Sequence, residues 1–326
     1  MRTGSRHAVT LPHDHPGLPG TFRHEAFMYA GRDAFVAGMS GFLRDGVTSG
    51  DPALVVVSAA KIDALRESLG ADADEVLFAD MADVGANPAR IIPAWRDFVS
   101  EHGGGGRALR GIGEPIHAQR SAAELIECHR HEALLNLAFA DTPAFWLVCP
   151  YDTDALAADV VAAARRTHPS VVDEGVACES ALFDGLEAVA EPLADPLPGA
   201  PAAAVEHEVR LDALGAVRRF VGRFAERAGL GGDRTADLLL AVHEVATNSV
   251  RHGGGGGRLL LWQEPGMVLC EVRDEGRITA PLAGRERPRL GQVGGYGLWL
   301  ANQVCDLVQV RAYAAGGVVR LHMRLP

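Results

Sequence analysis

The chain has 326 residues, 48% of them hydrophobic, which is enough for two ordinary domains that each bury a core. A formal net charge of -11 argues against a nucleic-acid binder, because such proteins need a basic surface to displace counterions from phosphates. We therefore expect proteins or small molecules as partners, and no direct contact with nucleic acid.

The five cysteines lie far apart in the chain and never form a C-x-x-C pair. This spacing indicates neither a disulfide framework nor a zinc site, so we expect reduced cysteines in the core. The chain also has no run of about eighteen apolar residues, and its N-terminus lacks the basic and apolar segments of a secretory signal. These features predict a soluble cytoplasmic protein with no membrane contact.

Residues 1–20 contain several Pro and Gly without periodicity and are predicted to be a disordered leader. Residues 21–190 then alternate between short apolar runs and longer helical stretches. That alternation predicts an α/β domain with a mostly parallel sheet covered by helices on both faces. The expected strands lie at 53–58, 76–81, 108–116 and 145–152.

A Pro- and Ala-rich segment at 191–204 cannot form a regular element and predicts a linker between two domains. The second domain, residues 205–326, is expected to open with a strand and two helices. Two more strands, a Pro-rich loop, a Gly-rich turn, a helix and two closing strands follow. Its clearest elements are strands at 205–211, 257–264 and 268–276 and helices at 233–251 and 298–307.

The helix at 233–251 begins with an Asp at a plausible N-cap and carries a polar stripe opposite its apolar face. Glu244, Asn248 and His252 stand four residues apart, so they line up on one side of the helix. The side chains expected to face the core are Leu238, Val242, Val245, Ala246 and Ser249.

The neighbours His243 and Glu244 raise the question of zinc, because two histidines four residues apart around a Glu form a metalloprotease site. The residue four positions after His243 is Thr247, so the second ligand is missing. The pair is therefore not a zinc-protease motif, and the stripe needs another explanation.

Two further signals follow in the chain, Asp274-x-Gly276 at a strand end and Gly295-x-Gly297-Leu298 at a helix start. An Asp beside a Gly can accept a hydrogen bond from an exocyclic amino group while a flat base approaches the backbone, which suits adenine. A Gly-rich turn at a helix start presents free N–H groups to a phosphate chain. Together these signals predict a nucleotide site.

The polar stripe can complete that site. The carboxamide oxygen of Asn248 suits Mg²⁺, which prefers oxygen ligands and usually includes substrate phosphates in its shell. One turn away, Glu244 can orient or deprotonate the attacking hydroxyl or water. The single lysine, Lys61, follows no P-loop pattern, so phosphates are expected to be held without a P-loop lysine.

Three ordered motifs of the second domain resemble the N, G1 and G2 boxes of the GHKL ATPase superfamily. They are Glu244-x-x-x-Asn248-x-x-x-His252-Gly253, Asp274-x-Gly276 and Gly295-x-Gly297-Leu298. The resemblance implies a two-layer α/β sandwich that binds ATP and Mg²⁺, with Asn248 on the metal, Asp274 on the adenine amino group and Glu244 as catalytic base. It implies cofactor-binding positions at Gly276, Gly295, Gly297 and Leu298, a supporting role for His252, and His243 packed beside them.

The helix at 233–251 looks most like that of the anti-sigma factor serine kinases of this superfamily. The resemblance implies a serine/threonine kinase that phosphorylates an anti-anti-sigma (STAS) partner, sequesters a sigma factor, or does both. A homodimer is left open. Two departures from the family pattern bear on the kinase interpretation: Arg277-Ile278 follow the Asp-x-Gly, and Val318-Val319 replace a closing-strand Thr.

Two alternatives remain. A non-catalytic anti-sigma binding module would use the same domain without phosphoryl transfer. A histidine kinase would need a phosphoacceptor His on a long dimerising helix just upstream. Here a Pro-rich linker precedes a strand-like segment that contains His207, which disfavours the histidine kinase.

The first domain resembles the MEDS sensory domain, a RecA-like α/β unit. The resemblance rests on short motifs at His24, Phe27 and Tyr29, at 113–115, at 132–136 and at 149–152. It implies a sensory role. A small-molecule ligand is one interpretation of the polar residues at its strand ends, and turn or cap residues are the alternative. Because open parallel sheets bind ligands at the carboxyl ends of their strands, Glu114, Tyr151 and Asp152 are the candidate contacts.

Overall fold

The computed structural model describes residues 21–104, 107–185, 196–289, 291–292 and 294–326. The chain divides into two compact units, Met1–Gly85 with Ala94–Ala188, and Ala86–Pro93 with Val189–Pro326. The predicted leader and the first part of the predicted linker lie outside the described residues. Within the described residues, no helix is both long and apolar enough to cross a bilayer.

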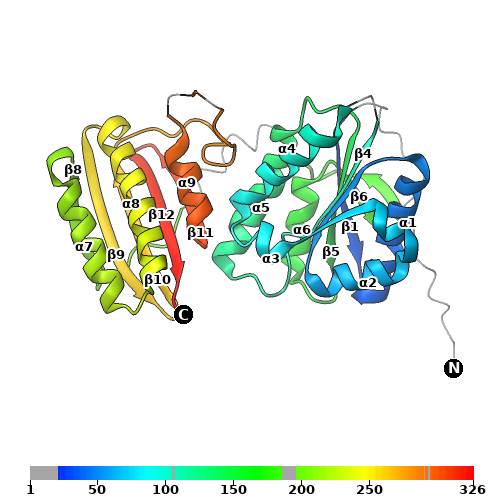
Figure 1. Ribbon diagram of the computed structural model, residues 1–326, viewed down its shortest axis with the longest axis horizontal. Coiled ribbons are helices and arrows are strands. Elements are labelled where there is room, and N and C mark those ends of the chain that lie inside the picture. The colour runs from blue at the N-terminus through cyan, green and yellow to red at the C-terminus, as the bar shows by residue number, and fades with distance from the viewer. Residues whose placement is uncertain (1–20, 105–106, 186–195, 290, 293) are drawn as a thin grey trace. The chain divides into compact units, whose positions relative to one another are not determined.

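The first unit contains a seven-stranded sheet in the order β3-β2-β4-β5-β1-β6-β7 (Figure 1). All described pairings in it are parallel except that of β6 with β7. This confirms the expected mostly parallel α/β sheet. The strands are β1 (Arg23–Tyr29), β2 (Ala53–Val57), β3 (Val76–Asp80), β4 (Leu109–Gly113), β5 (Phe145–Asp152), β6 (Ser170–Asp173) and β7 (Val176–Glu179).

Helices connect these strands, as parallel pairing requires. The α5 helix shows why one of them begins where it does: Ser121 and Glu124 form a reciprocal capping box, which satisfies two backbone N–H groups at the helix start. The helices are α1 (Gly31–Ser49), α2 (Ala59–Leu69), α3 (Met81–Val84), α4 (Ile91–His102), α5 (Ala122–Ala138) and α6 (Ala158–Thr167).

The second unit is a five-stranded antiparallel sheet in the order β11-β12-β10-β9-β8, covered by helices on one face (Figure 1). This confirms the expected GHKL-like two-layer sandwich. Its strands are β8 (Val205–Arg210), β9 (Gly256–Glu264), β10 (Met267–Asp274), β11 (Leu307–Tyr313) and β12 (Gly316–Arg324). Its helices are α7 (Leu214–Arg227), α8 (Gly232–His252) and α9 (Tyr296–Val304).

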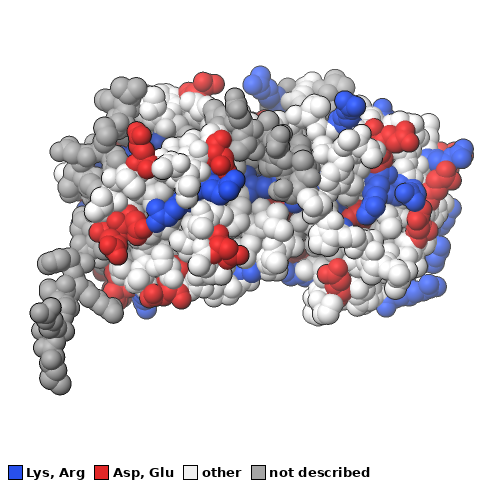
Figure 2. Space-filling view, turned by 180° about the vertical axis from the view of Figure 1, so that it is seen from behind, with Lys and Arg blue, Asp and Glu red and all other residues white. Residues whose placement is uncertain are grey.

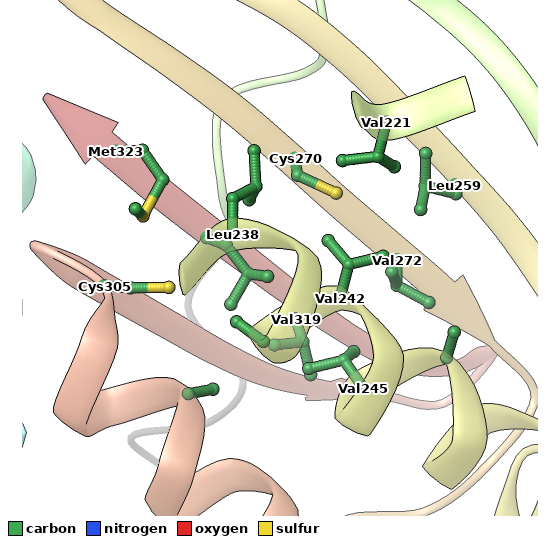
Figure 3. Packing of buried hydrophobic residues seen from close by; sticks show 14 of the residues in the cluster. Val221, Leu238, Val242, Val245, Leu259, Cys270, Val272, Cys305, Val319 and Met323 are labelled. Carbon is green, nitrogen blue, oxygen red and sulfur yellow. The ribbon is translucent and has the colours of Figure 1, made fainter. Parts of the chain in front are cut away.

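The core of the second unit lies between α8 and the sheet (Figure 3). On α8, Leu238, Val242 and Val245 pack toward Cys270 and Val272 of β10. Side chains alternate between the two faces of a strand, so these strand residues face the helices and the intervening ones face away. All the α8 residues that the helical periodicity assigned to the core are buried.

Two helix ends differ from the sequence prediction. Helix α8 is capped by Gly231 in an extended conformation, and Asp233 instead lies in the first turn, where the helix dipole favours an acid. Helix α9 ends at Val304, because Cys305 adopts extended backbone and buries its side chain in the core. The predicted helix at 298–307 therefore starts too late and runs into the turn before β11.

The outer face of this sheet carries several buried polar side chains. Glu271 on β10 is fully buried and forms ion pairs with Arg273, at 2.6 Å, and Arg320, at 2.5 Å. The described end of the predicted linker forms no helix or strand and lies against this face. There the Leu197 N–H donates to the Tyr313 hydroxyl at 3.0 Å, and Arg320 donates to the carbonyl of residue 198.

The surface face shown in Figure 2 carries acidic and basic side chains interspersed with one another. Among the residues that the structure describes there, the basic side chains form no continuous stripe.

Candidate functional site

Helices α8 and α9 come into close contact at the polar stripe. Gly297, in the first turn of α9, is buried, and a Cβ on it would lie 2.7 Å from Asn248 Nδ2 and 3.2 Å from Glu244 Oε2. Any side chain at this position would require the ends of the Asn248 and Glu244 side chains to move. The first and third motifs, which are about fifty residues apart in the chain, thus meet in space.

The turn that leads into α9 has the backbone geometry that the glycines predicted. Gly294 and Gly295 both adopt positive φ, at 87° and 85°, and Gly295 is the N-cap of the helix. The first N–H groups of a helix have no partner within it, so this turn can present donors and a positive dipole end to an anion. Leu298 follows and packs against the hydrophobic core of the unit.

Asp274 ends β10, and both of its carboxylate oxygens have a donor. Oδ2 accepts a hydrogen bond from the Ser249 hydroxyl at 2.5 Å, and Oδ1 accepts one from the Gly276 N–H at 2.8 Å. The residue is half-buried. Its carboxylate is therefore held in one orientation, which a directional contact with a base would need.

The Asp-x-Gly turn also lies against the end of α8. A Cβ on Gly253 would lie 2.5 Å from Asp274 Cγ, and a Cβ on Gly276 would lie 2.7 Å from the His252 carbonyl oxygen. The Glu275 N–H donates to the Gly253 carbonyl at 3.3 Å. The second motif is thus joined to the first through close backbone contacts at glycines.

Ser249 was assigned to the core by periodicity, but it also anchors Asp274. It is buried and lies one residue after Asn248. The sequence held one clue to this contact. A polar side chain on the apolar side of a helix, such as the Ser249 hydroxyl, needs a hydrogen-bond partner when buried.

The two histidines of the stripe region have different surroundings. His243 is exposed, so it does not pack beside Glu244 and Asn248, and that prediction is wrong. The helical turn places it toward solvent rather than toward α9. His252 is exposed in the last turn of α8, and its backbone carbonyl, rather than its ring, is close to the Asp-x-Gly turn.

The loop between β10 and α9 is tied to α9 at two points. Asn302 donates to the Gly284 carbonyl at 3.0 Å, and the Tyr296 hydroxyl donates to the Arg289 carbonyl at 3.2 Å. The loop carries Arg287 and Arg289 with exposed side chains. Since the single lysine lies in the first unit, these arginines are candidates for contacts with phosphate that the motif analysis missed.

A hollow of about 1220 Å³ opens on the outer face of the sheet. Its lining includes the glycine run 253–257, Arg273 and Asp274, but neither Glu244 nor Asn248. Arg273 alternates with the core-facing Val272, which places this hollow on the face away from α8. Asp274, at the end of β10, therefore contacts α8 on one face of the sheet and also lines the hollow on the other face.

In the first unit, the candidate ligand contacts lie at the ends of β4 and β5 as expected. Glu114 is buried and accepts hydrogen bonds from the Tyr29 hydroxyl at 2.7 Å and from Lys61 Nζ at 2.5 Å. Burial raises the pKa of the Glu114 carboxyl, against the opposing effect of Lys61. The only lysine of the chain is therefore engaged in an ion pair.

The other two candidates have different surroundings. Tyr151 is buried. Asp152 uses Oδ1 to accept hydrogen bonds from the N–H groups of Gly31, at 3.3 Å, and Asp154, at 3.1 Å, which is the pattern of a loop residue. A small-molecule pocket formed by Glu114, Tyr151 and Asp152 stays a prediction.

Comparisons with known proteins agree with both resemblances. Residues 23–169 match the family model of the MEDS domain, the methanogen/methylotroph DcmR sensory domain. Residues 208–323 match that of the histidine kinase-like ATPase domain. These matches confirm a MEDS domain at the N-terminus and a GHKL-like ATPase domain at the C-terminus.

Comparison with individual proteins does not assign a function to this chain. No curated protein matches the chain. A crystal structure of the RsbU and RsbW domains of a Mycobacterium tuberculosis protein matches with 21% identity and a TM-score of 0.30. That match covers 39% of this chain and 33% of the other, and the likeness is too slight to carry an argument.

Proposed function

We propose that the C-terminal ATPase domain binds ATP with Mg²⁺ and acts as an anti-sigma regulator that phosphorylates a serine or threonine of a STAS-type partner. In the same proposal it sequesters a sigma factor, and the MEDS domain responds to a small molecule. The observation that carries the proposal is the contact of Gly297 with Asn248 and Glu244. It sets a glycine turn suited to phosphate beside an oxygen ligand for metal and a carboxylate.

The residues present fit Mg·ATP. Asn248 would hold Mg²⁺ through its carboxamide oxygen, and bound Mg²⁺ would offset the charge of the phosphates. The backbone N–H groups that follow Gly295 would donate to phosphate oxygens at the start of α9. Arg287 and Arg289 can add positive charge from the neighbouring loop.

Asp274 would select adenine. Its carboxylate, fixed by Ser249 and Gly276, can accept a hydrogen bond from the exocyclic amino group of the base. Guanine carries a carbonyl oxygen at the corresponding position, which would face the carboxylate as a second acceptor. The proposal therefore includes a preference for ATP over GTP.

Glu244 would serve as the catalytic base. The partner hydroxyl oxygen forms a bond to the γ-phosphorus, the bond from that phosphorus to the bridging oxygen breaks, and ADP leaves. The hydroxyl proton passes to the Glu244 carboxylate. The short approach of Gly297 to Glu244 supports this role, because it sets the carboxylate beside the turn that would hold the phosphates.

The alternative is an anti-sigma binding module without phosphoryl transfer. It is favoured by Val318 and Val319, which offer no hydroxyl where a family Thr would help to fix the Asp and the base. The Ser249 hydroxyl supplies one such contact to Asp274 from α8 instead. The histidine kinase is disfavoured further, because His207 lies in β8 and not on a helix.

Incubation with radiolabelled ATP and a candidate STAS partner separates these functions. The parent chain should transfer label to the partner, Glu244→Ala should not, and His243→Ala should match the parent because His243 is an exposed neighbour. Sigma-factor capture should persist in all three. Binding of ATP without any transfer to the partner by the parent chain would support the binding module.

A further inference from the structure

Four buried side chains of the first unit converge although they lie far apart in the chain. They are His24 on β1, Glu132 on α5, Cys149 on β5 and His168 just after α6, each 2% exposed or less. Each offers one ligand atom, and these atoms all lie within 4.8 Å of one another. None of them belongs to the proposed ATP site, and their spacing in the chain matches no metal motif.

The distances among the four ligand atoms resemble those of a metal shell. Glu132 Oε2 lies 3.1 Å from His24 Nε2, 3.4 Å from His168 Nε2 and 3.3 Å from Cys149 Sγ. Cys149 Sγ lies 3.4 Å from His24 Nε2. With Zn–N, Zn–O and Zn–S bonds of about 2.0–2.3 Å, the edges of a zinc tetrahedron are about 3.3–3.8 Å. Small adjustments would bring these atoms to such edges.

Neighbouring groups set the tautomer of both histidines. His168 Nδ1 lies 2.8 Å from the Ala164 carbonyl oxygen, which can only accept, so Nδ1 carries the proton. His24 Nδ1 lies 3.0 Å from Asn136 Oδ1, and Asn136 is oriented by donating from Nδ2 to the Thr167 carbonyl at 2.8 Å. In the neutral rings, both Nε2 atoms therefore carry lone pairs directed at the cluster.

Such an arrangement needs a positive centre. Two Nε2 lone pairs face the same carboxylate oxygen, and the other carboxylate oxygen, Glu132 Oε1, is buried with no hydrogen-bond partner among the described residues. His168 Nε2 likewise makes no hydrogen bond within the described part of the chain. Buried polar atoms without partners are rare, and a bound cation would satisfy both of these atoms.

We propose that His24, Glu132, Cys149 and His168 bind one Zn²⁺ ion. The set of two imidazoles, one thiolate and one carboxylate suits zinc, and four protein ligands make a closed, structural site. On binding, the Cys149 thiol releases its proton to solvent. Two neutral imidazoles, one thiolate and one carboxylate then balance the charge of a divalent cation, which leaves the buried site neutral.

The ion would join the centre of the sheet to one of its helices, because β1 and β5 are paired neighbours and Glu132 comes from α5. The contacts of His24 with the Asn136 carboxamide and of His168 with the Ala164 carbonyl have the form of the outer-shell contacts that orient metal ligands. The competing explanation is a metal-free ion pair between Glu132 and a protonated histidine.

The test uses the full chain. After purification without chelators, elemental analysis should find about one zinc per chain. The chain stripped of metal and titrated with Co²⁺ should show thiolate-to-cobalt charge-transfer absorption that saturates at about one equivalent, and Zn²⁺ should displace it. An ion pair without metal predicts no retained zinc, no such absorption, and the same melting temperature with and without added Zn²⁺.

A pair of cysteine variants tests whether Cys149 is the thiolate ligand, and a third variant tests the outer shell. Cys149→Ser should abolish the charge-transfer absorption, whereas Cys128→Ser should keep it, because Cys128 is an equally buried thiol that donates to the Pro115 carbonyl instead. Asn136→Ala should weaken Co²⁺ binding by roughly 10–100-fold, as loss of an outer-shell contact does. Loss of the absorption in Cys128→Ser with retention in Cys149→Ser would contradict the site. If Cys149→Ser does not fold, the cobalt titration of the parent chain still decides.

Discussion

The Ser249 hydroxyl donates a 2.5 Å hydrogen bond to Oδ2 of Asp274, which joins the last turns of α8 to the end of β10. The Gly276 N–H holds the other oxygen of the same carboxylate. The residue proposed to recognise adenine is thus fixed by two donors from its own unit before any nucleotide arrives. Preorganisation of this kind reduces the cost of binding.

Asp274→Asn should weaken ATP binding by about 1.5–3 kcal/mol, the range for a hydrogen bond to a charged group. Ser249→Ala should cost less, about 0.5–1.5 kcal/mol, because it removes only one of two anchors and leaves the carboxylate in place. Competition binding against labelled ATP measures both. If GTP competes as well as ATP against the parent chain, the adenine assignment is wrong.

Gly297→Ala should weaken Mg·ATP binding about tenfold or more, which corresponds to about 1.4 kcal/mol. The new Cβ would meet Asn248 Nδ2 and Glu244 Oε2 and displace these two side chains from the positions proposed to bind the metal and the phosphates. The matched control is Gly222→Ala on α7, where the nearest atoms lie 3.9 Å away, at ordinary contact distance. Equal ATP affinity in the two variants would show that the α8–α9 contact does not shape the site.

Glu271→Ala should destabilise the C-terminal unit by about 3–5 kcal/mol, the cost of leaving a buried charge without its partner. Arg320, which is 4% exposed, would be that charge. The control is Glu206→Ala, which removes an exposed ion pair with Arg258 and should change stability by about 0.5 kcal/mol or less. Urea denaturation followed by tryptophan fluorescence and circular dichroism reports both.

Cysteine reactivity should separate one thiol from the others. Cys178 is exposed, contrary to the expectation that all cysteines lie in the core, whereas Cys270 and Cys305 are buried. Burial raises the pKa of Cys270 and of Cys305, so both stay protonated and slow to alkylate near neutral pH. Mass spectrometry after brief iodoacetamide treatment at about pH 8, near the ordinary thiol pKa, should find Cys178 modified first. Rapid modification of Cys270 would contradict the packing.

The fold followed from local patterns in the sequence where those patterns reflect burial. Short apolar runs located β2, β3, β4 and β5, and the helical periodicity of α8 located its buried face, because both are set by which side chains leave water. Helix ends were harder to predict. Gly231 and Cys305 decide them through backbone conformation, which composition does not report.

The candidate sites likewise contain some features that local sequence patterns predict and others that they do not. The glycine turn at Gly295 and the Asp-x-Gly turn could be found because each motif is local in the chain. The partner of Asp274 is Ser249, twenty-five residues away, and the four proposed zinc ligands span residues 24 to 168, so chain spacing held no signal for either. Contacts of that kind arise only when the sheet brings distant segments together.

The most direct test of the proposed function is a calorimetric titration of ATP, with and without Mg²⁺, into the full chain and its Asn248→Ala and Glu244→Ala variants. The parent should bind ATP with a requirement for Mg²⁺. Asn248→Ala should lose this binding, because it removes the proposed metal ligand. Glu244→Ala should bind nearly as tightly as the parent, and in the transfer assay its rate should fall roughly 10²–10⁴-fold, the usual contribution of a general base. Absence of binding heat for the parent at millimolar ATP with Mg²⁺ would contradict the central claim that the C-terminal domain binds ATP.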